Sequence, residues 1–244
     1  MIDIHCHILP EVDDGPKSWG VCEAMCRMAA GDGIEHIVAT PHGNDRYHYD
    51  REYVANLRDQ LQQRVGPAPR LGLGCDFHLS YDNLQAVLAT PERYCIEDSN
   101  YLLVELSNYS VPVQVGECFT RLADKGITAV LTHPERNPIL QQNLDRVLEW
   151  AEQGCVVQVT ASALAGSWGD RVQRAAKWLL ERRAVHVLAS DGHDVERRKP
   201  LLSAARDAAA QICGSDVARY LVEDNPGAIV SGQPLPYFPD PIRK

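Results

Sequence analysis

Short runs of apolar residues alternate along this chain with longer amphipathic stretches. The apolar runs have the length of buried strands and cover residues 2–7, 34–40, 70–79, 101–107, 127–132, 155–160 and 184–190. Helical spacing of apolar positions is found in residues 18–32, 52–64, 113–125, 142–153, 171–183, 201–213 and 216–222. Seven strands alternating with helices predict a parallel α/β sheet that is buried on both faces. A closed barrel and an open doubly wound sheet both satisfy this pattern.

The length of 244 residues and a hydrophobic content of 45% predict a single domain, residues 1–244, with a full core. Neither an internal repeat nor a low-complexity linker divides the chain. The tail at 234–244, PLPYFPDPIRK, is rich in proline and is expected to lie on the surface in extended form.

Charge and cysteine content narrow the class of protein. The formal charge of −9 argues against nucleic acid or an anionic membrane as the main partner. The chain has neither a signal peptide pattern nor a run of about 18 apolar residues, so we expect no membrane insertion. Its eight cysteines are scattered through apolar segments, which is typical of reduced core thiols. A cytoplasmic location is therefore expected.

Polar residues interrupt the apolar pattern at the end of nearly every predicted strand. In the first strand, His5 and His7 are two positions apart and therefore share one face. The carboxyl ends of parallel strands meet at one edge of a β/α fold, where active sites lie. The residues expected to converge there are His5, His7, Asp14, His42, Asp76, Glu105, His133, Asp191 and His193.

This combination of imidazole and carboxylate groups predicts a metal site. Taken singly, a carboxylate that ends a strand is a helix cap or a salt-bridge partner, but a recurrence at six strands favours metal binding. These ligands suit Mn, Fe or Zn, and no cysteine is placed to join them. Nine candidates exceed the needs of one ion, so we expect two or three ions, bridged by Glu105 or another carboxylate. Closely spaced ions can generate hydroxide at neutral pH and hold both oxygens of an in-line displacement.

Two arginines follow candidate ligand segments, Arg136 in HPER and Arg198 in DGHDVERRKP. A guanidinium group matches phosphate oxygens bidentately and keeps its charge. Together with the metal site, these arginines predict hydrolysis of a phosphomonoester without a covalent enzyme intermediate. Arg136 and Arg198 would stabilise charge on the phosphoryl oxygens, while Asp191 or His42 would assist the leaving group through water.

Other conspicuous residues favour structural roles. The histidines at 36, 48, 78 and 186 are expected on the surface or satisfied in the core, with His48 and His78 as candidates for the mouth of the site. Cys213 and Arg219 match the bare C-x5-R spacing of cysteine-dependent phosphatases. Because these two residues lie between helical patterns instead of after a strand, we interpret the match as coincidental.

Several segments resemble the PHP (polymerase and histidinol phosphatase) superfamily. The similarity is greater to its branch of bacterial tyrosine phosphatases, which are found with capsule and exopolysaccharide synthesis. The segments occur in family order and are MIDIHCHILPEVDDGPKSW, IVATPH, YLLVEL, THPERN, QVTASALAG and ASDGHD.

The resemblance implies a distorted seven-stranded β/α barrel of TIM-like form with three divalent ions, usually manganese. By this resemblance, one ion takes Asp76, Glu105 and His133, a second takes His5, His7, Glu105 and Asp191, and a third takes Asp14, His42 and His193. Arg136 and Arg198 would bind phosphate. The implied substrate is phosphotyrosine in the tail of a bacterial tyrosine kinase that controls polysaccharide export. Asp76 departs from the family, which more often has glutamate there.

Three other functions compete with this interpretation. The superfamily includes histidinol phosphatases, so the substrate could be a small phosphate ester. An amidohydrolase-like C–N hydrolase also begins with His-x-His, but it usually has a metal-bridging lysine that no predicted strand end carries here. A non-catalytic regulator would bind a phosphorylated peptide through the same cluster without turning it over.

Overall fold

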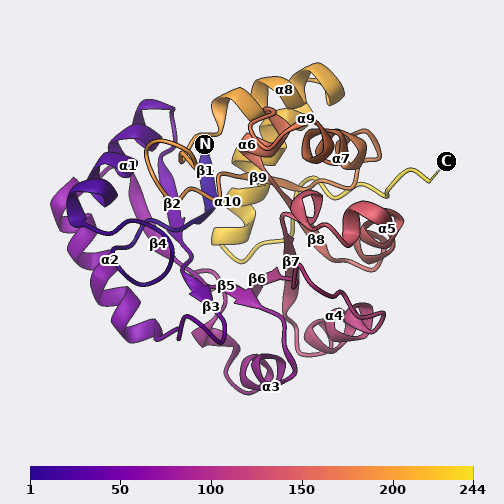
Figure 1. Ribbon diagram of the computed structural model, residues 1–244, viewed down its shortest axis with the longest axis horizontal. Helices are drawn as coiled ribbons and strands as arrows, with labels where there is room; N and C mark the ends of the chain where they lie inside the picture. The colour runs from indigo at the N-terminus through magenta and orange to yellow at the C-terminus, as the bar shows by residue number, and fades with distance from the viewer. Residues whose placement is uncertain (244) are drawn as a thin grey trace.

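Nine strands in two parallel sheets form the centre of the protein in a computed structural model, which describes residues 1–243. The smaller sheet has the order β1-β2-β4, with bounds Ile2–Cys6, His36–Ala39 and Arg70–Leu73. The larger sheet has the order β3-β5-β6-β7-β8-β9, with bounds His42–Gly43, Asp76–His78, Tyr101–Glu105, Thr128–Thr132, Val156–Thr160 and Val187–Ala189. The strands lie around a common centre and most of the helices surround them (Figure 1).

The structure shows neither the seven uninterrupted strands that the pattern predicts nor the single closed sheet that the family resemblance implies. The predicted strand at 70–79 is broken at Gly74-Cys75 into β4 and β5, and an additional short strand, β3, follows the predicted strand at 34–40 after a break at Thr40-Pro41. Proline has no backbone N–H to donate, so a sheet ladder is interrupted at Pro41. Between β9 and β1, pairing is reduced to one isolated parallel bridge that joins Cys6 and Gly192.

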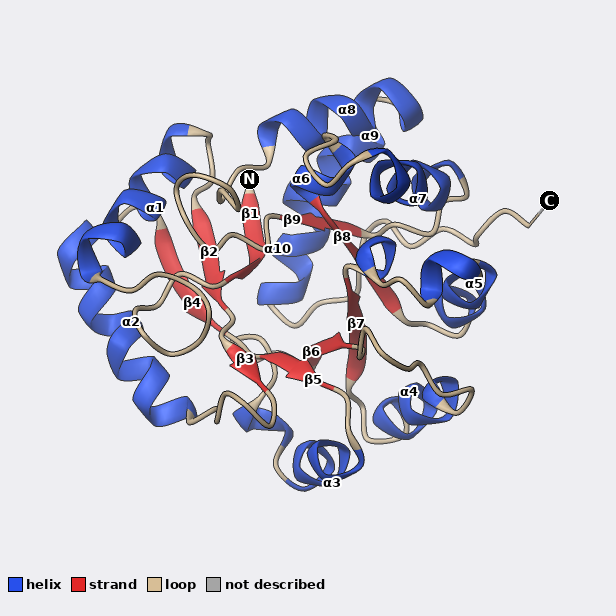
Figure 2. Cartoon of the chain, viewed as in Figure 1, coloured by secondary structure: helices blue, strands red, loops and turns tan. Residues whose placement is uncertain are grey.

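Most of the helices lie outside the strands, whereas α10 is seen within the ring of strands in Figure 2 and contributes Ile229 to the core there. The bounds of the helices are α1 Trp19–Gly31, α2 Arg51–Val65, α3 Tyr81–Ala89, α4 Val115–Ala123, α5 Asp145–Glu152, α6 Ala161–Leu164, α7 Asp170–Glu181, α8 Ser203–Cys213, α9 Ser215–Arg219 and α10 Asn225–Val230. Single turns are formed by η1 Pro91–Arg93, η2 Pro134–Arg136 and η3 Leu140–Gln142, and η4 Tyr220–Asp224 is a π-helical turn. The sequence pattern did not predict α3, α6 or α10, which are all short.

Alternation along the strands separates an outer core from an inner one. Along β6, Leu102 and Val104 pack in the outer core beneath the helices, whereas Leu103 belongs to an inner cluster with Val130 and Val156. Residues two positions further along each strand continue the inner face, so Glu105 of β6 lies beyond Leu103. The apolar inner cluster therefore forms a floor, and polar side chains at the carboxyl ends of the strands lie above it.

The chain terminus packs on the surface without forming a helix or strand in its described part. The backbone N–H of Ile242 donates to the carbonyl of Arg182 after α7 (2.8 Å). Lys244, the last residue of the predicted extended tail, lies outside the described residues. No helix within residues 1–243 is long and apolar enough to cross a membrane.

Candidate metal and phosphate site

The histidines of the first strand segment present their Nε2 atoms to one another. The Nε2 atoms of His5 and His7 are 3.3 Å apart. The opposite ring nitrogen of each histidine has its own acceptor, since His5 Nδ1 lies 3.0 Å from Gln158 Oε1 and His7 Nδ1 lies 2.6 Å from Asp13 Oδ2. An acceptor at Nδ1 fixes the tautomer and leaves the Nε2 lone pair free, which is the usual arrangement of metal-binding histidines.

Three groups of side chains bring possible ligand atoms within 4.8 Å of one another. They are His7 with Asp14, His42 and His193; His5 with His7 and Asp76; and His42 with Asp76 and Glu105. Asp191 adjoins the second group, because its Oδ1 lies 3.5 Å from His5 Nε2 and 3.4 Å from His7 Nε2. The structure thus gathers at one end of the sheets the residues that the sequence predicts to converge.

His133 lies at the margin of this cluster. Its Nε2 is 3.9 Å from Glu105 Oε1, and its ring centroid is 5.6 Å from that of His5. His133 has a left-handed backbone (φ 38°, ψ 50°), and Asp191 likewise has a positive φ of 50°. Non-glycine residues in this region are strained, and such strain is concentrated at functional sites.

Unsatisfied buried atoms provide a test of whether a metal fits here. Asp76 is fully buried, yet neither of its carboxylate oxygens has a hydrogen-bond partner within the described residues. The Nδ1 of His42 lies 3.0 Å from Asp76 Oδ2 and the Nε2 of His193 lies 3.2 Å from Asp14 Oδ1, but neither contact has the geometry of a hydrogen bond. Leaving such groups unpaired costs free energy, whereas coordination to a cation would satisfy all of them. The donor set of imidazole and carboxylate suits a divalent transition metal.

The buried carboxylates remain ionised. Burial raises the pKa of Asp191, but the charges of Arg136 and His5 outweigh burial and hold that pKa well below its usual range. Burial likewise raises the pKa of Asp76, while His5 and His42 lower it by more, so its pKa is also well below the usual range. The cluster therefore offers anionic oxygens to a cation at neutral pH.

Both predicted phosphate-binding arginines reach this cluster at one carboxylate oxygen. Arg136 Nη1 and Arg198 Nη2 donate to Oδ2 of Asp191, the latter at 2.5 Å. Because Asp191 Oδ1 faces the histidines, this single side chain separates the metal-ligand cluster from the paired guanidinium groups. The Nε atoms of both arginines are buried and have no hydrogen-bond partner within the described residues.

Several residues that support the site were not predicted as functional from the sequence. Asp13 accepts from His7 Nδ1 and also from the backbone N–H of His42 (3.1 Å). Trp168 lies against the arginines, with the Cζ of Arg136 3.9 Å from its ring centroid. Asp13 could have been suspected from its place beside Asp14, but the loop position of Trp168 gave no signal because stacking depends on the tertiary fold.

A buried hydrogen-bonded pair, Asp3 and Ser190, joins the first and last strand segments beneath the site. Asp3 is fully buried and accepts from the backbone N–H of Ser190 (2.9 Å) and from its Oγ (2.5 Å). Burial raises the pKa of Asp3 to about 6, although the hydrogen bonds from Ser190 act to lower it. Because Asp3 and Ser190 precede the site residues of their segments, their hydrogen bonds help to hold the first and last strand segments in register.

The histidines expected to be structural are in such positions. His36 is buried beside Glu97 (3.2 Å), His186 is buried, and His48 is exposed. His78 lies at the edge of the cluster, with its Nδ1 3.6 Å from Glu105 Oε2.

Cys213 and Arg219 do not form a phosphate-binding loop. Cys213 ends α8 and donates to the carbonyl of Ala209 (3.1 Å), whereas Arg219 ends α9 and pairs with Asp224 (3.1 Å). The thiol is also poorly suited to act as a nucleophile, because burial raises its pKa. The eight cysteines are free thiols, and six of them are buried.

Comparison with known proteins identifies close relatives along the whole chain. Tyrosine-protein phosphatase YwqE of Bacillus subtilis (strain 168) is 31% identical, with 100% of this chain and 97% of that protein covered. Tyrosine-protein phosphatase CpsB of Streptococcus pneumoniae is also 31% identical, with coverage of 96% and 99%. These matches confirm the resemblance to bacterial tyrosine phosphatases.

Solved structures give the same result. A chain from the work "Crystal structures of YwqE from Bacillus subtilis and CpsB from Streptococcus pneumoniae, unique metal-dependent tyrosine phosphatases" has a TM-score of 0.92 at 31% identity, with 100% of both chains covered. The lactonase Lmo2620 from Listeria monocytogenes has a TM-score of 0.61 at 11% identity and shares the fold alone. The family model for capsular polysaccharide synthesis, CpsB/CapC, matches residues 1–231, and this chain therefore belongs to the CpsB/CapC family.

Proposed function

We propose that this protein is a metal-dependent phosphatase that hydrolyses phosphotyrosine in a protein substrate. The observation that carries the proposal is the convergence of Arg136 and Arg198 on one oxygen of Asp191, beside the histidine and carboxylate cluster. Two guanidinium groups next to a cation site are suited to a phosphate dianion. The relatives named tyrosine-protein phosphatase support phosphotyrosine over other phosphate esters.

Two or three divalent ions, manganese or a related metal such as iron or zinc, would be held by the three groups described above. One group, with Asp14, His42 and His193, agrees with a ligand set implied by the family resemblance and adds His7. Another places His42 beside Asp76 and Glu105 where the resemblance implies His133. When bound, the ions would activate water and neutralise charge on the phosphoryl group.

The side chains of the protein would orient the substrate. Arg136 and Arg198 bind the phosphoryl oxygens, which fixes phosphorus next to the cluster and stabilises the charge that develops on these oxygens. Asp191 keeps both arginines in place through its Oδ2. His42 lies between Asp14 and Asp76 at the partly exposed edge of the cluster, where water would supply the proton for the leaving phenolate.

An apolar groove supports an aromatic leaving group and a peptide substrate. The groove has a volume of about 520 Å³ and lies between α3 and α4, where Leu84, Leu106 and Val115 contribute to its walls. His78 lines the groove and also contacts Glu105, so the groove opens beside the cluster. The natural substrate we propose is a bacterial tyrosine kinase linked to polysaccharide synthesis, in agreement with the family of the chain.

Phosphate release by metal-stripped protein tests this function. A phosphotyrosine peptide, a phosphoserine peptide and histidinol phosphate are compared, each with and without added Mn²⁺, Fe²⁺ or Zn²⁺. We expect release to depend on metal and to be fastest for the phosphotyrosine peptide. His7→Ala and Asp191→Ala should abolish release while leaving the circular dichroism spectrum unchanged.

Three outcomes would contradict the proposal. Retained activity in both variants would refute the site. A preference for histidinol phosphate would assign the protein to small-molecule phosphoesters. Tight binding of the phosphotyrosine peptide without turnover, with any of the metals, would indicate a regulator instead of an enzyme.

A further inference from the structure

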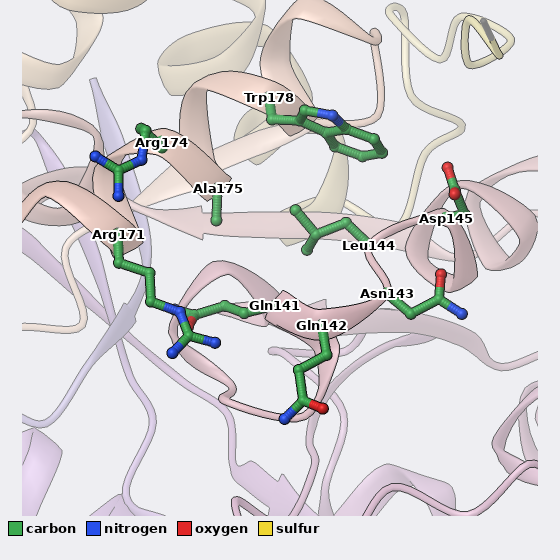
Figure 3. Close-up of a pocket in the computed structure, with 9 residues that line it drawn as sticks. All are labelled: Gln141, Gln142, Asn143, Leu144, Asp145, Arg171, Arg174, Ala175 and Trp178. Atoms are coloured by element: carbon green, nitrogen blue, oxygen red, sulfur yellow. The ribbon is translucent and has the colours of Figure 1, made fainter.

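A polar pocket is lined by a residue, Gln141, that is hydrogen-bonded to the turn carrying Arg136. It has a volume of about 390 Å³ and lies between α7 and the segment that joins η3 to α5 (Figure 3). Arg171 and Arg174 of α7 form one wall, and Gln141 and Gln142 of η3 face them. In Figure 3 the guanidinium group of Arg171 extends towards the two glutamines. The volume is sufficient for one or two side chains of a ligand.

The pocket shares supporting residues with the proposed phosphate site. Gln141 donates to the backbone carbonyl of Glu135 (2.6 Å), the residue before Arg136. On the other wall, Arg171 follows three positions after Trp168, whose ring stacks on Arg136. The same short segments therefore position the inner arginine and the walls of the pocket. A peptide whose phosphotyrosine binds Arg136 can extend over these segments towards the pocket.

The two pocket arginines carry uncompensated charge. Within the described residues, neither Arg171 nor Arg174 forms an ion pair or a side-chain hydrogen bond, although the chain has a net charge of −9. The acidic residue that lines the pocket, Asp145, lies across it from Arg171 in Figure 3. Two exposed guanidinium groups are suited to a carboxylate. The amides of Gln141 and Gln142 donate to the carbonyls of Glu135 and Pro138, and each has a second N–H that can face the same carboxylate.

We propose that this pocket binds an aspartate or glutamate side chain that flanks the phosphotyrosine of the substrate. This inference rests on the proposed function and specifies its substrate as an acidic phosphotyrosine segment. Attraction between the arginines and the acidic segment compensates for the repulsion that a negatively charged protein exerts on a negatively charged peptide. The contact contributes to selection among substrates, whereas a small aryl phosphate does not reach it.

The test compares substrates that differ only in the flanking charge. Two phosphotyrosine peptides are used, one with glutamates and one with glutamines around the phosphotyrosine, together with p-nitrophenyl phosphate. The variants are Arg171→Ala and Arg174→Ala, with Lys125→Ala as the control for loss of one positive charge. Lys125 is exposed in the turn before β7, at the opposite end of the strands from the metal cluster.

We expect Arg171→Ala to lower the ratio of kcat/KM between the glutamate and glutamine peptides about fivefold, near the upper limit of the loss typical of one exposed ion pair. Arg174→Ala should lower the same ratio, and Lys125→Ala should leave it unchanged. The preference of the unmodified protein for glutamate should weaken with added salt. Equal ratios in all proteins would overturn the pocket assignment.

Failure of the proposed phosphatase function can be distinguished from failure of the pocket assignment. A protein with added Mn²⁺ that releases phosphate from none of the three substrates refutes the phosphatase assignment. Binding of the labelled glutamate and glutamine peptides, followed by fluorescence anisotropy, then tests the pocket alone. Tighter binding of the glutamate peptide that is lost in Arg171→Ala supports the pocket, and equal binding of both peptides overturns it.

Discussion

Trp168 forms the platform on which Arg136 lies. The Cζ of Arg136 is 3.9 Å from the centroid of the indole ring, and that of Arg198 is 5.7 Å from the same centroid. The indole is itself anchored, because its Nε1 donates to the Oγ of Ser162 in α6 (2.9 Å). One aromatic side chain thus contacts both proposed phosphate-binding arginines, and a cation–π contact stabilises such an arrangement by about 0.5–2 kcal/mol.

Loss of the indole should weaken phosphate binding without removing the metal site. We expect Trp168→Ala to lower kcat/KM for p-nitrophenyl phosphate about tenfold, mainly through KM, because a freely moving guanidinium binds phosphate less well. Trp168→Phe keeps an aromatic face and should retain most activity. Steady-state kinetics together with metal content measure both effects. Loss of bound metal in Trp168→Ala would show that the indole supports the cluster instead.

Asp13 should control metal affinity although it is not among the proposed ligands. Its carboxylate accepts from His7 Nδ1 at 2.6 Å, and an amide nitrogen in that place could not accept this hydrogen bond. Asp13→Asn should therefore weaken metal binding by about tenfold to a hundredfold, as is typical of residues that orient metal-bound histidines. Competition with a chelator measures the affinity. Asp82→Asn, an exposed site in the first turn of α3, is the control and should have no effect.

Much of the fold follows from the hydrophobic pattern, and the discrepancies have local causes. The predicted run at 70–79 contains both β4 and β5, because an apolar run does not show where a strand bends. The bend occurs at Gly74, whose Cβ position would lie 3.1 Å from Ile96 and 3.2 Å from Thr40. The helix α3 was missed because only two of its nine residues, Leu84 and Val87, are buried, so its apolar face is too short to give a clear helical pattern.

The residues of the site could be predicted from the sequence where they lie at the carboxyl ends of strands. His7, Asp76 and Asp191 could be assigned to one cluster because parallel strands bring their carboxyl ends together. Trp168 could not be assigned, since nothing in the sequence shows that a loop after β8 folds against a turn after β7. A sequence pattern thus predicts which residues gather but not which neighbours support them.

The two arginines should each be intolerant of lysine. Arg136 and Arg198 both donate to Asp191 Oδ2, and an ammonium group cannot reproduce the planar, bidentate contact of a guanidinium with phosphate. We expect Arg136→Lys and Arg198→Lys each to lower kcat/KM about tenfold to a hundredfold, with weaker inhibition by inorganic phosphate. Kinetics at several phosphate concentrations provide the check. Unchanged phosphate inhibition in both variants would exclude the arginines as the phosphate site.

Stability should fall at mildly acidic pH because His186 is buried in its neutral form. Its Nδ1 accepts from the backbone N–H of Val157 (3.0 Å), its ring stacks on Phe238 at 4.2 Å, and burial lowers its pKa to about 3. Between the unfolded pKa of about 6.5 and this value, the unfolded chain takes up a proton that the folded chain refuses. The free energy of unfolding therefore decreases as pH falls through this window, by about 2 kcal/mol at pH 5.

The variant His186→Phe isolates this contribution. It leaves the N–H of Val157 without its acceptor and should lower stability at pH 7.5 by about 1–3 kcal/mol. It has no proton to gain at this position, however, so its stability should decline less between pH 7.5 and pH 5. Urea unfolding of both metal-loaded proteins is measured at several pH values. The contributions of the metal-cluster histidines cancel in the difference between the two unfolding free energies. Parallel pH profiles would mean that His186 is protonated in the folded protein or that it becomes exposed before the protein unfolds.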